Sequence, residues 1–353
     1  MKILHTADIH LKEKGDDRWI TLKKLLELGR KKKIGIFIIS GDLFDKNADA
    51  AKLRPEIRDI FSNNGFKIII IPGNHDENSF RSGLHFGEDA VILNEPFKSF
   101  EIDELRIVGL PFEHTGGKNI LDVITANKSR LNRDKKNILL CHGELLDSFF
   151  SRNDFGEEGA ERYMPFWLHY FNDLNLDYVL AGHFHTRFDV RVFADRGYFV
   201  YPGSPVSITK KEIGQRKVNL FELGQPPAEC PIDSPHYVEL SLTLDPFEMK
   251  NPLLILKDYL KDLNSQAKLI LTIQGFCDAK AIKTSELELQ RKIKDIVGEK
   301  LEELHFAVRD VQEIIDDGLF KAFHRKVEES KLEPRRKKEL VDITIKAMIE
   351  AKS

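Results

Sequence analysis

Five short polar clusters in the first two hundred residues carry side chains that can bind metal ions. They offer Asp, His and Asn without closely spaced cysteines, and they read Asp8-Ile9-His10, Gly41-Asp42-Leu43-Phe44-Asp45, Gly73-Asn74-His75-Asp76, Cys141-His142-Gly143-Glu144 and Gly182-His183-Phe184-His185. Imidazole and carboxylate ligands suit Mn, Fe, Zn or Ni, whereas thiolates indicate structural zinc. The clusters therefore indicate a metal centre with nitrogen and oxygen ligands.

The number of these ligands exceeds what one tetrahedral ion needs. Two ions with four protein ligands each would use all of them if one carboxylate bridges the pair: Asp8, His10, Asp42, Asn74, His142, His183 and His185. Two ions about 3.5–4 Å apart can clamp the attacking and leaving oxygens of a phosphoryl displacement, with a bridging water as nucleophile. One such cluster alone could be a simple turn, and the isolated His169, His236 and His305 are expected to be ordinary core or surface residues.

Each cluster follows a short apolar run, and these runs must bring the clusters together. The runs are rich in Ile, Val and Leu, mostly without alternation, and cover residues 3–4, 34–39, 66–71, 138–140 and 178–180. Such runs predict strands buried on both faces, as in an α/β sheet covered by helices. Ligands of open α/β sheets bind outside the carboxyl ends of the strands, so five distant clusters can form one site.

The remaining pattern divides the chain into three predicted domains, 1–225, 236–311 and 316–353. Helices are predicted at 21–33 and 56–61, and further strands at 187–192, 198–201 and 218–223. A proline-rich break over 224–235 ends this region, because proline continues neither a helix nor a central strand. The next segment predicts strand, helix, strand, helix, strand at 237–244, 251–263, 268–273, 285–301 and 305–308.

The last segment combines two narrow apolar stripes with a basic run. Leu319, Phe323 and Val327 form one stripe, and Val341, Ile345 and Ile349 form the other. Such stripes suit docking onto a partner helix or packing on the protein's own surface, and both interpretations stay open. The run Arg335-Arg336-Lys337-Lys338 could contact phosphate or form a solvated face.

Composition excludes several classes of protein. The 353 residues include 54 Lys and Arg against 57 Asp and Glu, a net charge of −3, which excludes attachment to nucleic acid through a uniformly basic surface alone. No apolar run approaches the ~20 residues of a membrane helix, and no signal segment is recognised at the start. The three widely spaced cysteines fit reduced thiols in the cytoplasm.

The five motifs DIH, GDLFD, GNHD, CHG and GHFH resemble those of the calcineurin-like metallophosphoesterases, and within them most closely the Mre11/SbcD DNA-repair nucleases. Residues 4–11 resemble the LHTxDxHL opening of that branch, and residues 201–205 resemble its YxGSP segment. The resemblance covers residues 1 to about 223. It implies an α/β fold, a layered β-sandwich flanked by helices, with a small α/β capping domain and a helical C-terminal tail.

The resemblance also implies a role for each site residue. Asp8, His10 and His185 would hold one metal, and Asn74, His142 and His183 the other, with Asp42 bridging them. His75 would stabilise charge at the scissile phosphate or protonate the leaving 3′ oxygen, and Asp45 or Asp76 would orient its ring. Asp45 lies where several archaeal and eukaryotic members carry His. Glu144 has no implied role and is expected to be exposed and structural.

The resemblance implies a DNA phosphodiesterase with two divalent ions, expected to be Mn²⁺. It would act as a 3′→5′ exonuclease and single-strand endonuclease in double-strand break repair. Its partners would be DNA, an SMC-like ATPase of the Rad50/SbcC type and a second copy of the chain, through 51–63 or 79–87. The alternatives are a small-molecule phosphodiesterase or phosphatase, which the extra segment after residue 225 disfavours, and a non-catalytic scaffold, which the complete ligand set disfavours.

Overall fold

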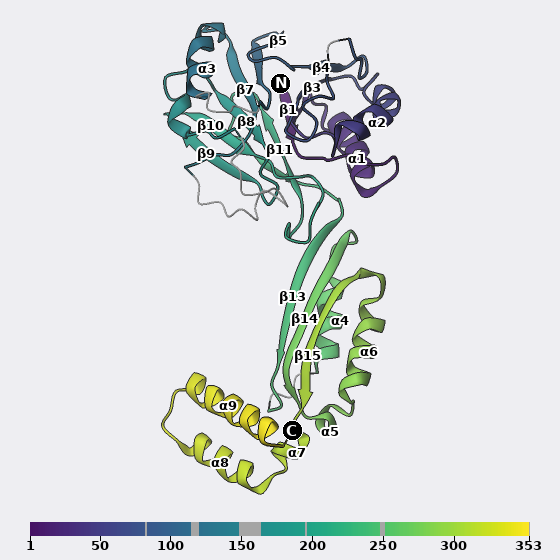
Figure 1. Ribbon diagram of the computed structural model, residues 1–353, viewed down its shortest axis with the longest axis vertical. Coiled ribbons are helices and arrows are strands. Elements are labelled where there is room, and N and C mark those ends of the chain that lie inside the picture. The colour runs from purple at the N-terminus through teal and green to yellow at the C-terminus, as the bar shows by residue number, and fades with distance from the viewer. Residues whose placement is uncertain (82, 114–119, 148–163, 195, 248–250, 353) are drawn as a thin grey trace. The chain divides into compact units, whose positions relative to one another are not determined.

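The computed structural model describes residues 1–81, 83–113, 120–147, 164–194, 196–247 and 251–352 (Figure 1). The chain divides into two compact units, Met1–Tyr237 and Val238–Ser353. Within the described ranges, we find no helix long and apolar enough to cross a membrane.

The first unit contains two six-stranded sheets packed face to face, which confirms the predicted layered β-sandwich. In spatial order, the first consists of β12 (Glu229–Pro231), β11 (Lys217–Glu222), β1 (Lys2–Thr6), β2 (Ile36–Ser40), β3 (Lys67–Ile71) and β4 (Ala90–Ile92). The second consists of β5 (Ser99–Ile102), β6 (Leu105–Leu110), β7 (Lys136–His142), β8 (Tyr178–Gly182), β10 (Gly197–Tyr201) and β9 (Asp189–Phe193). Strands β1, β2 and β3 are parallel, as are β6, β7 and β8.

The continuous apolar runs form strands because both faces of each sheet are covered. A fully buried layer between the sheets includes Ile38 and Ile69 from one sheet and Ile138 and Leu180 from the other. The outer face of the first sheet packs on α1 (Asp17–Lys32) and α2 (Asn47–Ile60). The outer face of the second packs on α3 (Ile120–Asn127) and the 3₁₀ turn η3 (Leu168–Phe171). Such double coverage explains why these strands do not alternate in polarity.

Helix α2 is longer than the sequence pattern predicted. It begins at Asn47, nine residues before the predicted start at Glu56, and includes Pro55. Its buried residues Ala50, Leu53 and Ile57 recur at helical spacing, but the small alanine makes the stripe inconspicuous and proline usually ends a helix.

The second unit follows the predicted strand and helix order. Its three-stranded sheet consists of β13 (His236–Leu244), β14 (Ala267–Cys277) and β15 (Leu301–Asp310). Helices α4 (Pro252–Lys261) and α6 (Glu286–Val297) pack on one face of this sheet through a core that includes Leu256, Leu271 and Ile293 (Figure 1). Shorter segments of this unit are α5 (Ala279–Ile282), α7 (Gln312–Ile315) and η4 (Gly298–Lys300), and the first unit contains the short 3₁₀ turn η1 (Lys128–Arg130).

The two apolar stripes of the last segment pack largely on the chain itself. Helices α8 (Gly318–Glu329) and α9 (Pro334–Lys352) form a hairpin whose buried cluster includes Phe320, Val327, Val341 and Ile345. Leu319 is 76% exposed and therefore lies outside this cluster. For the buried residues of the two stripes, the structure therefore supports packing on the protein's own surface.

The basic run is paired with acidic and carbonyl groups of the same unit. Arg335 and Arg336 lie 3.3 and 2.9 Å from the two carboxylate oxygens of Glu339, and Lys338 Nζ lies 2.8 Å from Asp245 Oδ2. Lys337 Nζ donates to the carbonyl oxygen of Glu328. These contacts favour the solvated-face interpretation of the run.

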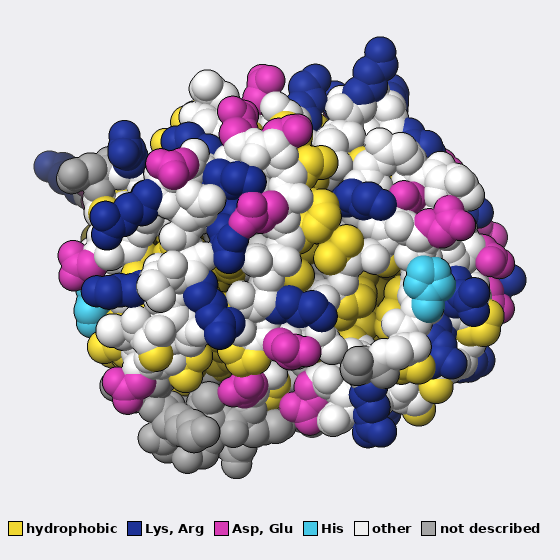
Figure 2. All heavy atoms as spheres, turned by 90° about the horizontal axis from the view of Figure 1, so that it is seen from above, with side chains coloured by type: hydrophobic (Ala, Val, Ile, Leu, Met, Phe, Trp, Pro, Cys, Tyr) yellow, Lys and Arg dark blue, Asp and Glu magenta, His cyan; other side chains and the backbone are white. Residues whose placement is uncertain are grey.

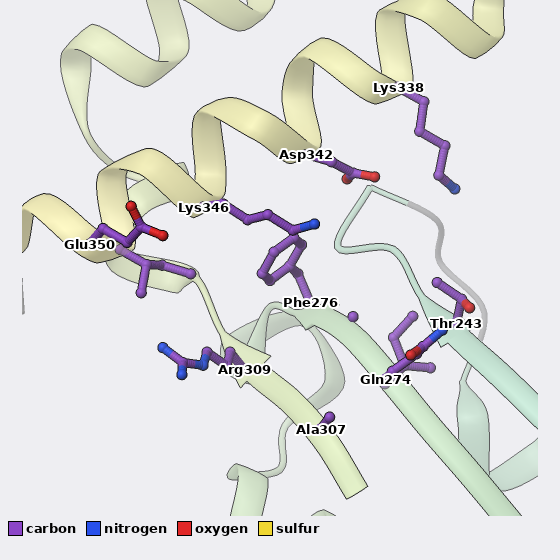
Figure 3. Close-up of a pocket in the computed structure, with 12 residues that line it drawn as sticks. Thr243, Gln274, Phe276, Ala307, Arg309, Lys338, Asp342, Lys346 and Glu350 are labelled. Atoms are coloured by element: carbon purple, nitrogen blue, oxygen red, sulfur yellow. The ribbon is translucent and has the colours of Figure 1, made fainter.

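Charges of both signs also line a hollow of about 510 Å³ in the second unit. Figure 3 shows Lys338, Asp342, Lys346 and Glu350 projecting from α9 toward the ends of the strands, where Arg309 lies. Basic and acidic residues alternate along α9 at every fourth position, so the hollow is lined by charges of both signs. On the face of the molecule in Figure 2, basic and acidic side chains are likewise intermixed.

Two isoleucines of α9 test the packing of the hairpin. Ile345 is fully buried, whereas Ile343 is 60% exposed. We expect Ile345→Ala to lower the free energy of unfolding of the second unit by about 2–5 kcal/mol, because it leaves a cavity. Ile343→Ala should change it by less than about 0.5 kcal/mol. Urea unfolding monitored by hydrogen exchange measures both, and equal effects would contradict the described packing.

Candidate metal centre

The sequence-predicted ligands meet at the carboxyl ends of five strands. Asp8 and His10 follow β1, Asp42 follows β2, and Asn74 follows β3. From the second sheet, His142 ends β7, and both His183 and His185 follow β8. Because β1–β3 run parallel to one another and β7 runs parallel to β8, these ends lie at one edge of the sandwich.

Hydrogen bonds join the five loops to one another. The amides of Asp8 and His10 donate to the carbonyl oxygens of Gly41 (3.1 Å) and Asp42 (2.9 Å). The amide of His75 donates to Asp42 Oδ1 at 2.9 Å, and that of His183 donates to Asp8 Oδ1 at 3.0 Å. The two aspartates thus hold neighbouring loops in register as well as facing the centre.

The ligand atoms lie within coordination reach of common points. Asp42 Oδ2 is 3.2 Å from His142 Nε2 and 3.7 Å from His10 Nε2. Asp8 Oδ1 is 3.7 Å from His185 Nε2 and 4.0 Å from His142 Nε2. Three groups each place their ligand atoms within 4.8 Å of one another: Asp8 with His10 and His185, His10 with Asp42 and His75, and Asp8 with Asp42 and His142. Because Asp8, His10 and Asp42 each occur in two of these groups, the groups form a single cluster.

Asn74 and His183 lie beside the same cluster. Asn74 Oδ1 is 2.9 Å from His142 Nε2. The ring of His183 lies 5.4 Å from the ring of His142, centroid to centroid. All seven predicted ligands are therefore brought together, and all except the half-buried Asn74 are buried.

The donor set fits divalent cations. Both ring nitrogens of His10 are buried and make no hydrogen bond to any residue that the structure describes. A buried polar atom without a hydrogen bond is costly unless an ion or water contacts it. Nitrogen and oxygen donors in this number suit borderline and hard divalent metals.

Burial and mutual charge perturb the ionisation of these groups strongly. Burial raises the pKa of Asp8 to about 6 and holds the pKa of His10 well below its usual value. At Asp42 burial acts to raise the pKa, but the charge of His142 and of other histidines outweighs it and lowers the pKa. At His142 burial acts to lower the pKa, but Asp42 and Asp8 outweigh it and raise the pKa to about 10. Two carboxylates this close stay ionised together only when positive charge lies between them.

Four of the seven ligands adopt left-handed backbone conformations. The φ angles of Asp8, His10 and Asp42 are 55°, 52° and 51°, and that of His183 is 93°. Such conformations cost roughly 1–3 kcal/mol each in residues other than glycine and concentrate at functional sites. The surrounding hydrogen bonds therefore hold strained loops in place.

His75 and Asp45 lie at the edge of this cluster. His75 is half-buried, its ring lies 4.6 Å from that of His10, and its Nδ1 lies 3.0 Å from the carbonyl oxygen of Asp45. The Asp45 carboxylate lies 3.7 Å from His10 Nδ1 and pairs with Arg18 at 3.0 Å and Lys12 at 3.3 Å. Asp45 therefore contacts His75 through its main chain and His10 through its side chain.

Asp76 joins the second and third loops. Its buried carboxylate accepts hydrogen bonds from the amides of Gly73 (2.8 Å) and Phe44 (3.1 Å). Burial, with a smaller effect of Asp42, raises the pKa of Asp76 to about 7.

Glu144 was expected to be exposed, and this prediction is wrong. The residue is buried, and its carbonyl oxygen accepts from the amide of Phe166 at 2.8 Å. Together with the bond from the Leu146 amide to the carbonyl oxygen of Phe166 (2.8 Å), this hydrogen bond pairs the chain after β7 with the segment around Phe166. The isolated histidines behave as expected, since His236 is buried with Nδ1 2.8 Å from the carbonyl oxygen of Ser234, while His169 and His305 are exposed.

Sequence reasoning missed Glu212, which lies behind His185. Its carboxylate is buried, with Oε1 3.5 Å from His185 Nδ1. Burial acts to raise the pKa of Glu212, but hydrogen bonding to His185 and the charges of His185 and Arg216 lower the pKa to about 2. Glu212 lies in a loop that shows neither a strand pattern nor a motif. The only feature of the sequence that could have indicated its role was an acidic residue shortly after the Tyr201–Pro205 segment.

Gly41 provides the space that the His142 ring occupies. A Cβ at Gly41 would lie 2.0 Å from His142 Nδ1, whereas a Cβ at Gly65 would meet nothing within 4 Å. Both glycines have positive φ, 92° and 80°, so Ala costs similar backbone strain at each. We expect Gly41→Ala to lower the free energy of unfolding by roughly 1–3 kcal/mol more than Gly65→Ala and to abolish tight Mn²⁺ binding, as measured by urea unfolding and calorimetry. Equal behaviour of the two variants would contradict the described position of His142.

Comparison with known proteins gives matches of three kinds. A family model described as calcineurin-like phosphoesterase matches residues 1–187. Two curated relatives are each named DNA double-strand break repair protein Mre11. The one from Sulfurisphaera tokodaii is 28% identical over 236 residues, and the one from Saccharolobus solfataricus is 25% identical over 240 residues.

The coverage of these matches is partial. Each curated alignment covers 60% of this chain and 56% of the relative, so the chain spans about half the length of the curated relatives it matches. The solved structure of TT1561 from Thermus thermophilus matches with a TM-score of 0.41 at 14% identity, over 62% of this chain and 92% of that one. The family model, by contrast, spans more than half of the chain and includes all five motifs. The chain therefore belongs to the calcineurin-like phosphoesterase family.

Proposed function

We propose that this chain is a two-metal, Mn²⁺-dependent DNA phosphodiesterase. It would have 3′→5′ exonuclease and single-strand endonuclease activity and would act in double-strand break repair. The observation that carries the proposal is the convergence of seven nitrogen and oxygen donors with the half-buried His75 beside them. The printed name of the two relatives, DNA double-strand break repair protein Mre11, supports DNA as the substrate.

The distances support a division of the donors between two ions. Asp8, His10 and His185 would hold one ion, and Asn74, His142 and His183 the other. Asp42 would contact both, since its Oδ2 lies near His142 and His10 alike. Two divalent ions bound here would supply an acidified water and positive charge for the phosphoryl oxygens.

His75 would act as a proton donor at the scissile phosphodiester. The carbonyl oxygen of Asp45 can only accept a hydrogen bond, so the Nδ1 that lies 3.0 Å from it carries a hydrogen. Nε2 is then the nitrogen that gains and loses a proton. A protonated His75 would donate from Nε2 to the leaving 3′ oxygen, and the amide bond to Asp42 would keep the residue in place.

A parallel assay on two substrates tests this proposal. With Mn²⁺ and end-labelled DNA, we expect nucleotide release that a chelator abolishes. We expect His75→Ala to reduce kcat by roughly 10²–10⁴-fold because the proton donor is lost, while the Mn²⁺ affinity stays within a few-fold. The exposed His169→Ala serves as the matched control and should keep full activity.

The same assay separates the two alternatives. Hydrolysis of bis-p-nitrophenyl phosphate without DNA cleavage would replace the proposal with a small-molecule phosphodiesterase. Absence of Mn²⁺-dependent hydrolysis of both substrates would point to a non-catalytic scaffold.

We further propose roles for the remaining segments. Residues 1–225 would be the catalytic domain, 236–311 a capping domain that helps shape the DNA path, and 316–353 the site of an SMC-like ATPase partner of the Rad50/SbcC type. A second copy of the chain would bind through 51–63 or 79–87. The buried residues of the hairpin stripes pack against one another within the hairpin. The ATPase would therefore contact exposed apolar side chains. Among the described residues of the hairpin, Leu319 and Ile343 are the most exposed of these.

The ATPase contact can be tested on the full chain. We expect the double variant Leu319→Asp with Ile343→Asp to lose binding to an SMC-like ATPase in a pull-down, because two charges would enter an apolar interface. Leu254→Asp, at a position in α4 that is 59% exposed, is the matched control and should bind normally. Unchanged binding of the double variant would refute the role of the hairpin.

A further inference from the structure

A buried carboxylate backs the outer side of the candidate ligand His185. Glu212 is fully buried, and its Oε1 lies 3.5 Å from His185 Nδ1. The opposite ring nitrogen, Nε2, lies 3.7 Å from Asp8 Oδ1. The ring therefore lies between a carboxylate of the proposed metal cluster and a carboxylate outside it.

The Glu212 carboxylate is itself fixed by hydrogen bonds from one short loop. Oε2 accepts from Ser204 Oγ at 2.8 Å and from the amide of Ile208 at 2.9 Å. Oε1 accepts from the amide of Thr209 at 3.3 Å. Because these hydrogen bonds hold both oxygens, the carboxylate has a single position. It therefore fixes the position of any group that donates a hydrogen bond to it.

Arg216 fixes the main chain of the same histidine. Its buried guanidinium donates to the carbonyl oxygens of His185, Thr186 (3.0 Å) and Ser204 (3.0 Å). Loop 204–216 thus contacts His185 twice, once at the ring through Glu212 and once at the backbone through Arg216.

We infer that Glu212 is a positioning residue that holds the His185 ring with the hydrogen on Nδ1 and leaves the Nε2 lone pair for a metal ion. This inference rests on the proposed metal centre. A carboxylate accepts and cannot donate, so it selects the Nδ1–H tautomer of a neutral imidazole. Only the unprotonated nitrogen can bind a metal, and a carboxylate behind a ligating histidine fixes its tautomer and orientation.

The substitution Glu212→Gln tests this role. A carboxylate only accepts hydrogen bonds, whereas the NH₂ group of an amide donates them. If the amide oxygen faces His185, the NH₂ group meets the Ile208 amide, which is also a donor. If the NH₂ group faces His185, it requires an acceptor at Nδ1 and moves the ring hydrogen to Nε2. The first arrangement replaces the charged acceptor of Nδ1–H with a weaker neutral one, and the second removes the acceptor, so both weaken the Nδ1–H tautomer that metal binding needs.

Two measurements on the full chain test the inference. Nitrogen-15 NMR of the metal-free protein, with the His185 signal assigned by difference from His185→Asn, reports the tautomer directly. We expect Nδ1–H in the parent protein and a shift toward Nε2–H in Glu212→Gln. Calorimetry with MnCl₂ should show roughly 10–100-fold weaker binding of one Mn²⁺ equivalent in the same variant.

Ser207→Ala is the matched control for loop structure. Its hydroxyl donates to the main-chain carbonyl oxygen of Glu212 at 2.7 Å and does not contact the carboxylate. We expect this variant to lose stability while the His185 signal stays unchanged. An unchanged His185 tautomer and unchanged Mn²⁺ binding in Glu212→Gln would overturn the inference and leave the proposed function intact. Failure of the parent protein to bind Mn²⁺ would instead count against the proposed function, while the NMR result would still decide the tautomer.

Discussion

The structure of the first unit depends on one electrostatic constraint, the burial of two aspartates among five histidines at the edge of the sandwich. Asp8 and Asp42 lie in an interior where isolated charge is very costly. The opposite shifts of their pKa values, with Asp8 raised to about 6 and Asp42 lowered, express this conflict. Divalent cations bound here would remove it, because they would supply positive charge where the carboxylates converge.

The rigid packing of the sandwich holds the two aspartates and the histidines together. Two sheets with a buried apolar layer between them fix the carboxyl ends of β1, β2, β3, β7 and β8. The loops beyond them tolerate left-handed backbone at Asp8, His10, Asp42 and His183 because amide hydrogen bonds link loop to loop. Stability stored in the packed layers thus offsets strain at the site.

Sequence alone predicted the strands that carry the ligands, because buried parallel strands have a distinctive continuous apolar composition. It also grouped the ligand clusters, since each cluster follows such a strand. Strands β4, β5, β6 and β12 were missed. Three of them, β4, β5 and β12, have only three or four residues and do not stand out from loops, whereas the six-residue β6 was missed although its run is largely apolar. The burial of Glu144 and the position of Glu212 behind His185 depend on contacts between distant segments, which no local pattern encodes.

The family assignment and the site geometry support the proposal that seven donors bind two ions with Asp42 between them. Anomalous diffraction at the manganese edge from crystals grown with MnCl₂ tests it most directly. We expect two peaks, one beside His10 and His185 and one beside His142 and His183, both in contact with Asp42. A single peak, or peaks away from Asp42, would contradict it.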